Sequence, residues 1–173
     1  MNRLSSVRAF LPHEWRIYRE LRLRALADSP DAFGRTLAEE KGRPDTEWSS
    51  RLASGADKRW NLPLVAEIGA DAIGLAWGRI EPSEPEVAKL YQMWVDPKFR
   101  RLGAGQMLLQ AVIGWARDAN ARYLALGVTC GDSPAIRLYS GAGFKPIGEP
   151  EPLRPGCELL AQSMQLELRG DAT

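Results

Sequence analysis

Apolar residues recur at two different periods along this chain, and each change of period predicts a change of element. Residues 4–10 alternate weakly between apolar and polar side chains, which predicts a first strand. Pro12 follows where the first turn of a helix tolerates proline. Residues 13–27 then place apolar side chains four positions apart, at Ile17, Leu21 and Ala25, and this spacing predicts an amphipathic helix.

A second, looser helical region covers residues 32–54. It is interrupted at residues 42–44 and restarts where Asp45 or Thr46 is expected to act as the N-cap. Because this region contains few apolar residues, we expect it to form a lid and not a part of the core.

The middle of the chain changes to period two. Residues 62–68 and 72–80 predict two strands joined by a tight turn, and residues 87–95 predict a third strand. Alternation within the third strand places Gln92 on the same face as Leu90 and Trp94. We therefore expect a three-stranded antiparallel meander.

The helical period returns over residues 103–119 with a broad apolar stripe, made up of Leu108, Leu109, Val112, Ile113, Ala116 and Ala119. Residues 123–128 form a continuous apolar run, as expected for a buried strand with a parallel neighbour. A helix over 133–140 and strands at 144–147 and 162–168 complete the prediction.

The joint between the strand that ends at Val95 and the helix that follows carries two arginines and two glycines. A helix begins with backbone N–H groups that lack intrahelical acceptors, and its dipole is positive at that end. Gly103 and Gly105 would let phosphate oxygens approach these amides, while Arg100 and Arg101 would add positive charge. The alternative for the arginines is a solvated basic pair at the start of a helix.

Composition narrows the functional classes. The chain has 173 residues, with 23 basic and 22 acidic side chains, two cysteines and one histidine. Near-zero net charge gives no electrostatic footprint for nucleic acid or a membrane surface, and a single histidine leaves little material for a metal site. We expect a single domain over residues 1–173, cytoplasmic because it has neither a secretory leader nor a disulfide framework.

Two motifs, together with this order of elements, resemble the GNAT (Gcn5-related N-acetyltransferase) superfamily, in particular its bacterial small-molecule members. Residues 100–105, Arg-Arg-Leu-Gly-Ala-Gly, resemble the pyrophosphate loop of that family. Residues 132–144 resemble its second motif, except that Asp132 stands where the family has asparagine. Asp132 can still cap a helix by accepting amide hydrogen bonds, but it cannot donate as an amide would.

The resemblance implies an α/β (mixed α+β) GNAT fold. Its central sheet would be mixed and mostly antiparallel, with six to seven strands and about four flanking helices. The sheet would splay where the strand ending at Val95 pairs in parallel with the strand that follows Asn120. The resemblance also implies acetyl-CoA as co-substrate, held by Met93, Trp94, Val95, Arg100, Arg101, Leu102, Gly103, Ala104, Gly105, Gln106, Asp132, Ala135 and Tyr139.

Acyl transfer from a thioester to an amine needs positioning, a neutral amine and a proton for the departing thiolate. Tyr139 matches the family tyrosine that gives this proton; the alternative is a ring that only packs in the core. For the general base we consider Glu81, at the end of a predicted strand, against deprotonation through water. Cys130 suggests a covalent acetyl-enzyme, but no nearby histidine activates it.

Two other phosphate-binding motifs do not match this sequence. A dinucleotide-binding motif would need a third glycine where Met107 and Leu108 follow, and a Walker-type loop would need a Gly-Lys pair. A non-catalytic acyl-CoA-binding or interaction module on the same scaffold stays open. We expect the acceptor to be an amine of a small molecule or peptide, which the sequence does not identify further. Because homodimers are common in the family, the resemblance is also compatible with a homodimer.

Overall fold

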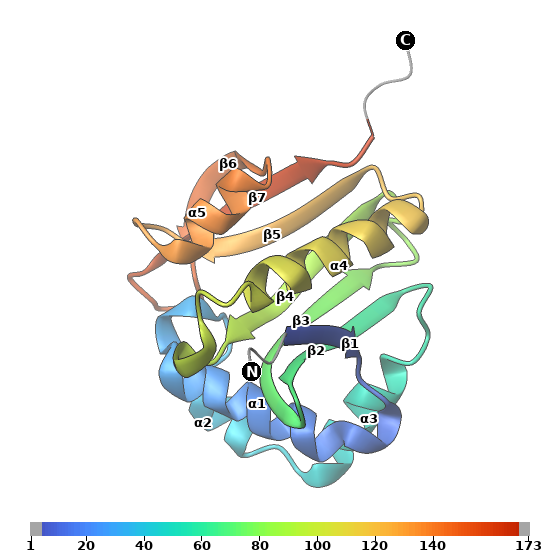
Figure 1. Ribbon diagram of the computed structural model, residues 1–173. Helices are drawn as coiled ribbons and strands as arrows, with labels where there is room; N and C mark the ends of the chain where they lie inside the picture. Colours follow the sequence, from blue (N-terminus) through green and yellow to red (C-terminus); the bar gives the residue numbers. More distant parts are fainter. Residues whose placement is uncertain (1–4, 170–173) are drawn as a thin grey trace.

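A seven-stranded mixed sheet forms the centre of the protein (Figure 1). The computed structural model describes residues 5–169. The sheet order is β1-β2-β3-β4-β5-β7-β6, and only the β4–β5 pair is parallel. The strands are β1 (Ser5–Ala9), β2 (Asn61–Ile68), β3 (Asp71–Ile80), β4 (Val87–Val95), β5 (Tyr123–Thr129), β6 (Lys145–Pro152) and β7 (Leu160–Glu167).

Five α-helices and three short 3-10 helices flank this sheet within residues 5–169. In Figure 1, α4 and α5 lie in front of the sheet, while α1, α2 and α3 lie together at the bottom of the view. The helices are α1 (Trp15–Asp28), α2 (Leu37–Lys41), α3 (Asp45–Ser54), α4 (Ala104–Asp118), α5 (Pro134–Gly141), η1 (Pro12–Glu14), η2 (Pro30–Ala32) and η3 (Pro97–Phe99). The expected order of elements and the mixed sheet are confirmed.

The sheet separates two hydrophobic cores. The larger core lies against α4, whose stripe of Leu108, Leu109, Val112, Ile113 and Ala116 is buried as expected. The smaller core packs α1 and α3 against β2, β3 and β4. It includes Trp77 and Trp94, which are 6% and 5% exposed.

Helix α3 corrects the expectation of a lid. Trp48 is fully buried and Leu52 is 1% exposed, so this helix belongs to the smaller core. The sequence pattern concealed this because a short helix needs only two large apolar side chains, one turn apart, to pack against a neighbour. The N-cap position is Pro44, which has no side-chain cap, so neither Asp45 nor Thr46 acts as the N-cap.

A β-bulge interrupts β4. Gln92 and Met93 lie opposite the single residue Ala76 of β3, and Gln92 has a φ of 57°. Each extra residue reverses the alternation beyond it, so Leu90 packs in the larger core whereas Trp94 packs in the smaller one. The expectation that Leu90 and Trp94 share one face was wrong for this reason.

Strands β4 and β5 separate soon after they meet. Their parallel pairing covers only Val87 to Lys89 of β4 and Tyr123 to Ala125 of β5. From Leu90 onward β4 has no ladder partner on its β5 side within the described residues. This confirms the expected splay and leaves a free backbone edge on β4 up to Val95.

Shortening one side chain of the α4 stripe tests the larger core. Leu109 is completely buried between α4 and the sheet. We expect Leu109→Ala to lower the free energy of unfolding by about 2–5 kcal/mol, because it removes buried methyl groups and leaves a cavity. Denaturant titration measures the change, with Ile17→Ala, at a 41% exposed position of α1, as the control. A loss for Leu109→Ala no larger than that of the control would contradict this packing.

Candidate active site

The loop between β4 and α4 leaves the N-terminal backbone amides of α4 uncovered. After Val95, the Asp96 carboxylate accepts a hydrogen bond from the backbone N–H of Lys98 at 2.9 Å and so fixes the turn of η3. Arg101 and Gly103 then adopt positive φ values of 66° and 86°. Alternating backbone conformations of this kind point successive N–H groups to one side, an arrangement that suits an anion.

No side chain in the part of the chain described by the structure caps α4. The first intrahelical bond runs from the N–H of Met107 to the carbonyl of Gly103, at 3.0 Å. A Cβ placed on Gly103 would meet no atom within 4 Å, so there is open space at this helix end. The N-terminal amides and the positive end of the dipole therefore fit a pyrophosphate group.

Three elements converge beside this loop. A Cβ placed on Gly105 would lie 3.7 Å from Met93 of β4 and 3.7 Å from Leu138 of α5. The free edge of β4, the open start of α4 and the helix that carries Tyr139 thus meet at the splay. The loop residues Leu102 and Gln106 are exposed, whereas Ala104 is buried beneath them.

The two loop arginines behave differently. The Arg100 guanidinium turns back, donating from Nε to the Val95 carbonyl at 2.9 Å and from Nη2 to Asp28 Oδ2 at 2.9 Å. Asp28 also accepts from Trp94 Nε1 at 2.9 Å, and these bonds, with that from Trp94 the strongest, lower the pKa of its carboxyl. Arg100 therefore holds the loop against the end of α1, while Arg101 stays exposed at the open start of α4, whose backbone from residue 101 to 106 we call the cradle.

Sequence reasoning did not single out Asp28, because it stands in a Ser-Pro turn that looks like an ordinary helix stop. A second fastening lies next to it, where Arg24 of α1 forms an ion pair with Asp96. Asp28 and Asp96 each pair with an arginine that is distant in the sequence, and these pairs form only when α1 packs against β4. No local sequence signal could therefore have identified these two ion pairs.

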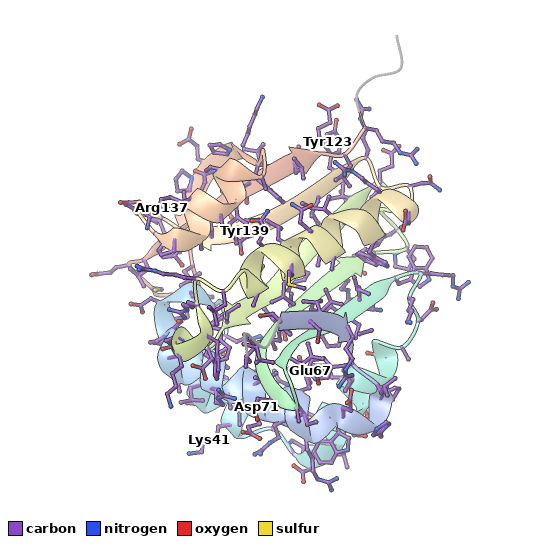
Figure 2. The ribbon with its side chains drawn as sticks, in the orientation of Figure 1. Lys41, Glu67, Asp71, Tyr123, Arg137 and Tyr139 are labelled. Atoms are coloured by element: carbon purple, nitrogen blue, oxygen red, sulfur yellow. The ribbon has the colours of Figure 1, made fainter. Side chains whose placement is uncertain are left out.

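Tyr139 belongs to α5, lies on the side of this helix toward α4 (Figure 2) and is 8% exposed. Its ring packs at 5.8 Å from that of Phe144, tilted by 59°. Burial raises the pKa of the Tyr139 hydroxyl to about 12 because it disfavours the phenolate. The hydroxyl is thus protonated at neutral pH, as a proton donor must be.

At the start of α5, Ser133 is the residue that caps the helix. Its side chain accepts from the N–H of Ile136 at 3.2 Å. Asp132 is exposed and pairs with Arg137 Nη1 at 2.5 Å, so it does not take the capping role that its carboxylate allowed. Ala135 is half-buried against the larger core. Arg137 points outward from α5 in Figure 2.

Glu81 does not lie at the splay. It follows the far end of β3, seven residues beyond Gly74, which pairs with Val95; this is roughly 20 Å along the strand. Its carboxylate forms an exposed ion pair with Arg79 Nε at 2.7 Å. Glu81 was considered as the general base because it follows the end of a central strand. The direction of β3, however, places Glu81 at the end of the sheet opposite to the splay.

Glu81→Gln tests this correction directly. We expect kcat/KM for any acceptor to stay within about twofold of wild type, because neutralising an exposed, distant carboxylate changes the field at the splay very little. Steady-state assay of coenzyme A release measures it. A fall of about tenfold or more would restore Glu81 to the reaction.

Cys130 is exposed at the end of β5 and forms no disulfide. The histidine, His13, lies in η1, on the α1 side of the fold. Within residues 5–169 there is no group of three or more histidine, cysteine or acidic side chains placed to hold a metal ion. In the same range, no helix combines the length and apolar character needed to cross a membrane.

A splayed mixed sheet with an uncapped helix start at the splay defines the fold class of the N-acetyltransferases. Residues 14–144 match the model of the acetyltransferase (GNAT) family, and the chain belongs to this family. Among solved structures, a GNAT acetyltransferase from Streptococcus pneumoniae superposes with a TM-score of 0.79 at 18% identity, covering 94% of this chain and 98% of that one.

A second solved structure is the spermidine N-acetyltransferase of Vibrio cholerae in complex with CoA and spermine, with a TM-score of 0.76 at 16% identity over 96% of this chain and 97% of that one. Among curated relatives, the mycothiol acetyltransferase of Thermomonospora curvata is 28% identical over 121 residues, which is 70% of this chain and 37% of that protein. The chain thus spans less than half the length of that relative.

Proposed function

We propose that this protein transfers the acetyl group of acetyl-CoA to a primary amine of a small molecule or peptide. The observation that carries the proposal is the convergence of three features at the splay: the open start of α4, the free edge of β4 and helix α5, which carries the buried Tyr139. Family membership supports the same activity.

In this proposal, acetyl-CoA supplies an activated acetyl thioester and the chain positions it. The amides from Arg101 to Gln106, with the Arg101 side chain, would hold the pyrophosphate, and Arg100 would keep the loop in place through Asp28. The free edge of Met93, Trp94 and Val95 would bind the pantetheine arm by backbone hydrogen bonds. Ala135 and Asp132 would border the site from α5.

Tyr139 would donate the proton that the departing thiolate needs. With Glu81 far from the splay, we propose that the amine loses its proton through water. Direct attack of the amine needs no acetyl-enzyme, so Cys130 has no part in it. The predicted single domain over residues 1–173, the cytoplasmic location and a homodimer stay predictions.

The test combines binding with turnover. Calorimetry should show one acetyl-CoA bound per chain, and an amine panel should reveal acceptors by release of coenzyme A. Binding without turnover on any amine would favour the non-catalytic acyl-CoA-binding module. Intact-mass spectra that show an acetyl group on Cys130 in the absence of acceptor would replace direct attack by a covalent route.

A further inference from the structure

Arg22 is a buried cation without a carboxylate partner. It lies on the inward face of α1 and is only 4% exposed. Its Nε and Nη1 atoms are buried and make no hydrogen bond to any of residues 5–169. Its guanidinium lies against the ring of Phe33, 4.6 Å from the centroid. Burial lowers the pKa of Arg22, but a guanidinium remains charged at neutral pH.

The neighbouring charges do not neutralise Arg22. Glu40, 1% exposed, is the buried carboxylate whose charge acts on Arg22, and both of its oxygens already accept hydrogen bonds from other arginines. Arg43 Nε donates to one at 3.0 Å, and Arg51 Nη1 donates to the other at 2.9 Å. Arg51 is a further cation that acts on Arg22 and lowers its pKa. Arg43 also pairs through Nη1 with Glu47 at 2.8 Å, so two carboxylates face three cations and Arg22 is left as the buried charge without a partner.

Arg22 lies on α1, which packs against β4 on the face of the sheet opposite α4. One turn before it, Tyr18 donates from its hydroxyl to Gln92 Oε1 at 2.8 Å, at the bulge of β4. The segment that carries Phe33 closes against the end of β5, where Thr129 Oγ1 donates to the Asp31 carbonyl at 2.5 Å. Helix α1 therefore reaches the bulge of β4 one turn before Arg22, and Phe33, which Arg22 contacts, follows directly after the segment at the end of β5.

An uncompensated buried charge costs free energy, and a binding site is one reason for a protein to keep it. The planar guanidinium fork matches a carboxylate in a bidentate pair. A positive charge near the acceptor also lowers the pKa of its amine and so favours the neutral, nucleophilic form. The same charge repels a polyamine.

We propose that Arg22 binds the carboxylate of the acceptor, which is therefore a small amine that also carries a carboxylate, of the amino-acid type. Phe33 covers the guanidinium from the short connection between η2 and α2, and its ring moves aside when the carboxylate enters. This inference rests on the proposed acetyl transfer and specifies the substrate class of the same site.

Pairs of acceptors that differ only in the carboxylate show how much this group contributes to acetylation. The panel is the set of L-amino acids and their C-terminal amides, with spermidine as a cationic amine, compared at equal concentrations of neutral amine. For wild-type protein we expect kcat/KM at least about 100-fold higher for the preferred amino acid than for its amide, because the amide leaves Arg22 unpaired. A preference for amides or spermidine would overturn the inference while leaving the proposed acetyl transfer intact.

Variants connect that preference to Arg22. Arg22→Met should lower kcat/KM for the amino acid by about 100-fold and change that for the amide by less than about threefold. Arg22→Lys keeps a charge but loses the fork, so we expect an intermediate loss and a folded protein if the methionine variant is unstable. Arg16→Met, on the exposed side of the same helix, is the control. Equal losses on both members of a pair would assign Arg22 a purely structural role and overturn the inference.

Two further readouts keep the outcomes distinct. The melting temperature of ligand-free Arg22→Met should equal or exceed that of wild type, since the variant removes an unpaired buried charge; a structural arginine would give the opposite sign. If acetyl-CoA binds but no amine is acetylated, the proposed function fails. N-acetyl amino acids with coenzyme A then test the inference: a rise in melting temperature that Arg22→Met abolishes supports it, and no rise overturns it.

Discussion

Tyr139→Phe should lower kcat by about 100-fold and leave the dissociation constant of acetyl-CoA nearly unchanged. The reason is that the variant removes one hydroxyl, the proposed proton donor for the thiolate, and a positioned general acid contributes about 10²–10⁴-fold to rate. The aromatic ring keeps its packing against Phe144, so the fold should hold. Pre-steady-state and steady-state release of coenzyme A, with calorimetry for binding, measure the two effects.

Tyr123→Phe is the matched control, because Tyr123 begins β5 at the paired end of the β4–β5 ladder, away from the splay. It removes an equivalent phenolic hydroxyl, but from β5 and not from α5. We expect kcat for this control to equal wild type. A wild-type kcat for Tyr139→Phe would remove Tyr139 from the mechanism and leave only its packing role.

The raised pKa of Tyr139 also predicts a pH dependence. Because its pKa is about 12 in the folded protein and 10.0 is its ordinary value, the hydroxyl stays protonated through the range used for assays. Its ionisation should therefore produce no descending limb in kcat between pH 7 and about 10. Stability should instead fall as pH rises from about 10 toward 12, where the unfolded chain releases the proton first. Tyr139→Phe should reduce this alkaline loss.

Gly103→Ala should weaken acetyl-CoA binding by about 10- to 100-fold with a modest loss of stability. Gly103 has a φ of 86°, where an alanine costs about 1–2 kcal/mol, and its Cβ would enter the open space at the start of α4. Phosphate oxygens would then lose their close approach to the amides. Calorimetry gives the affinity, and denaturant titration gives the stability.

Gly148→Ala separates strain from binding. Gly148 lies in β6, has a φ of 66°, and like Gly103 leaves open space around an added Cβ. Both variants should lose similar stability, but only Gly103→Ala should lose affinity for acetyl-CoA. If the two variants kept equal, wild-type affinity, the cradle at the start of α4 would not be the pyrophosphate site.

Local sequence signals were enough for elements whose cause is local. The helix stripe of α4 and the glycines before it lie within a few turns of chain, so periodicity and residue type located both. The parallel pairing of β5 was also predicted from its continuous apolar run, although the structure fully buries only one face of this strand, at Leu124, Leu126 and Val128. The position of Tyr139 near the cradle came from the family resemblance, which carries three-dimensional information that a single pattern lacks.

The sequence by itself therefore determined the order of elements and the family of the chain, and it predicted an anion site at the joint at residues 100–105. Tertiary structure decided what depends on contacts between distant segments. In the folded protein Arg100 pairs with Asp28, and Glu81 lies far from the splay. A bulge in β4 places Leu90 and Trp94 on opposite faces of the sheet, and Arg22 is buried without a counter-charge. Hydrophobic periodicity records which side of an element is buried, whereas the partner that a buried charge meets is set by packing between elements far apart in the chain.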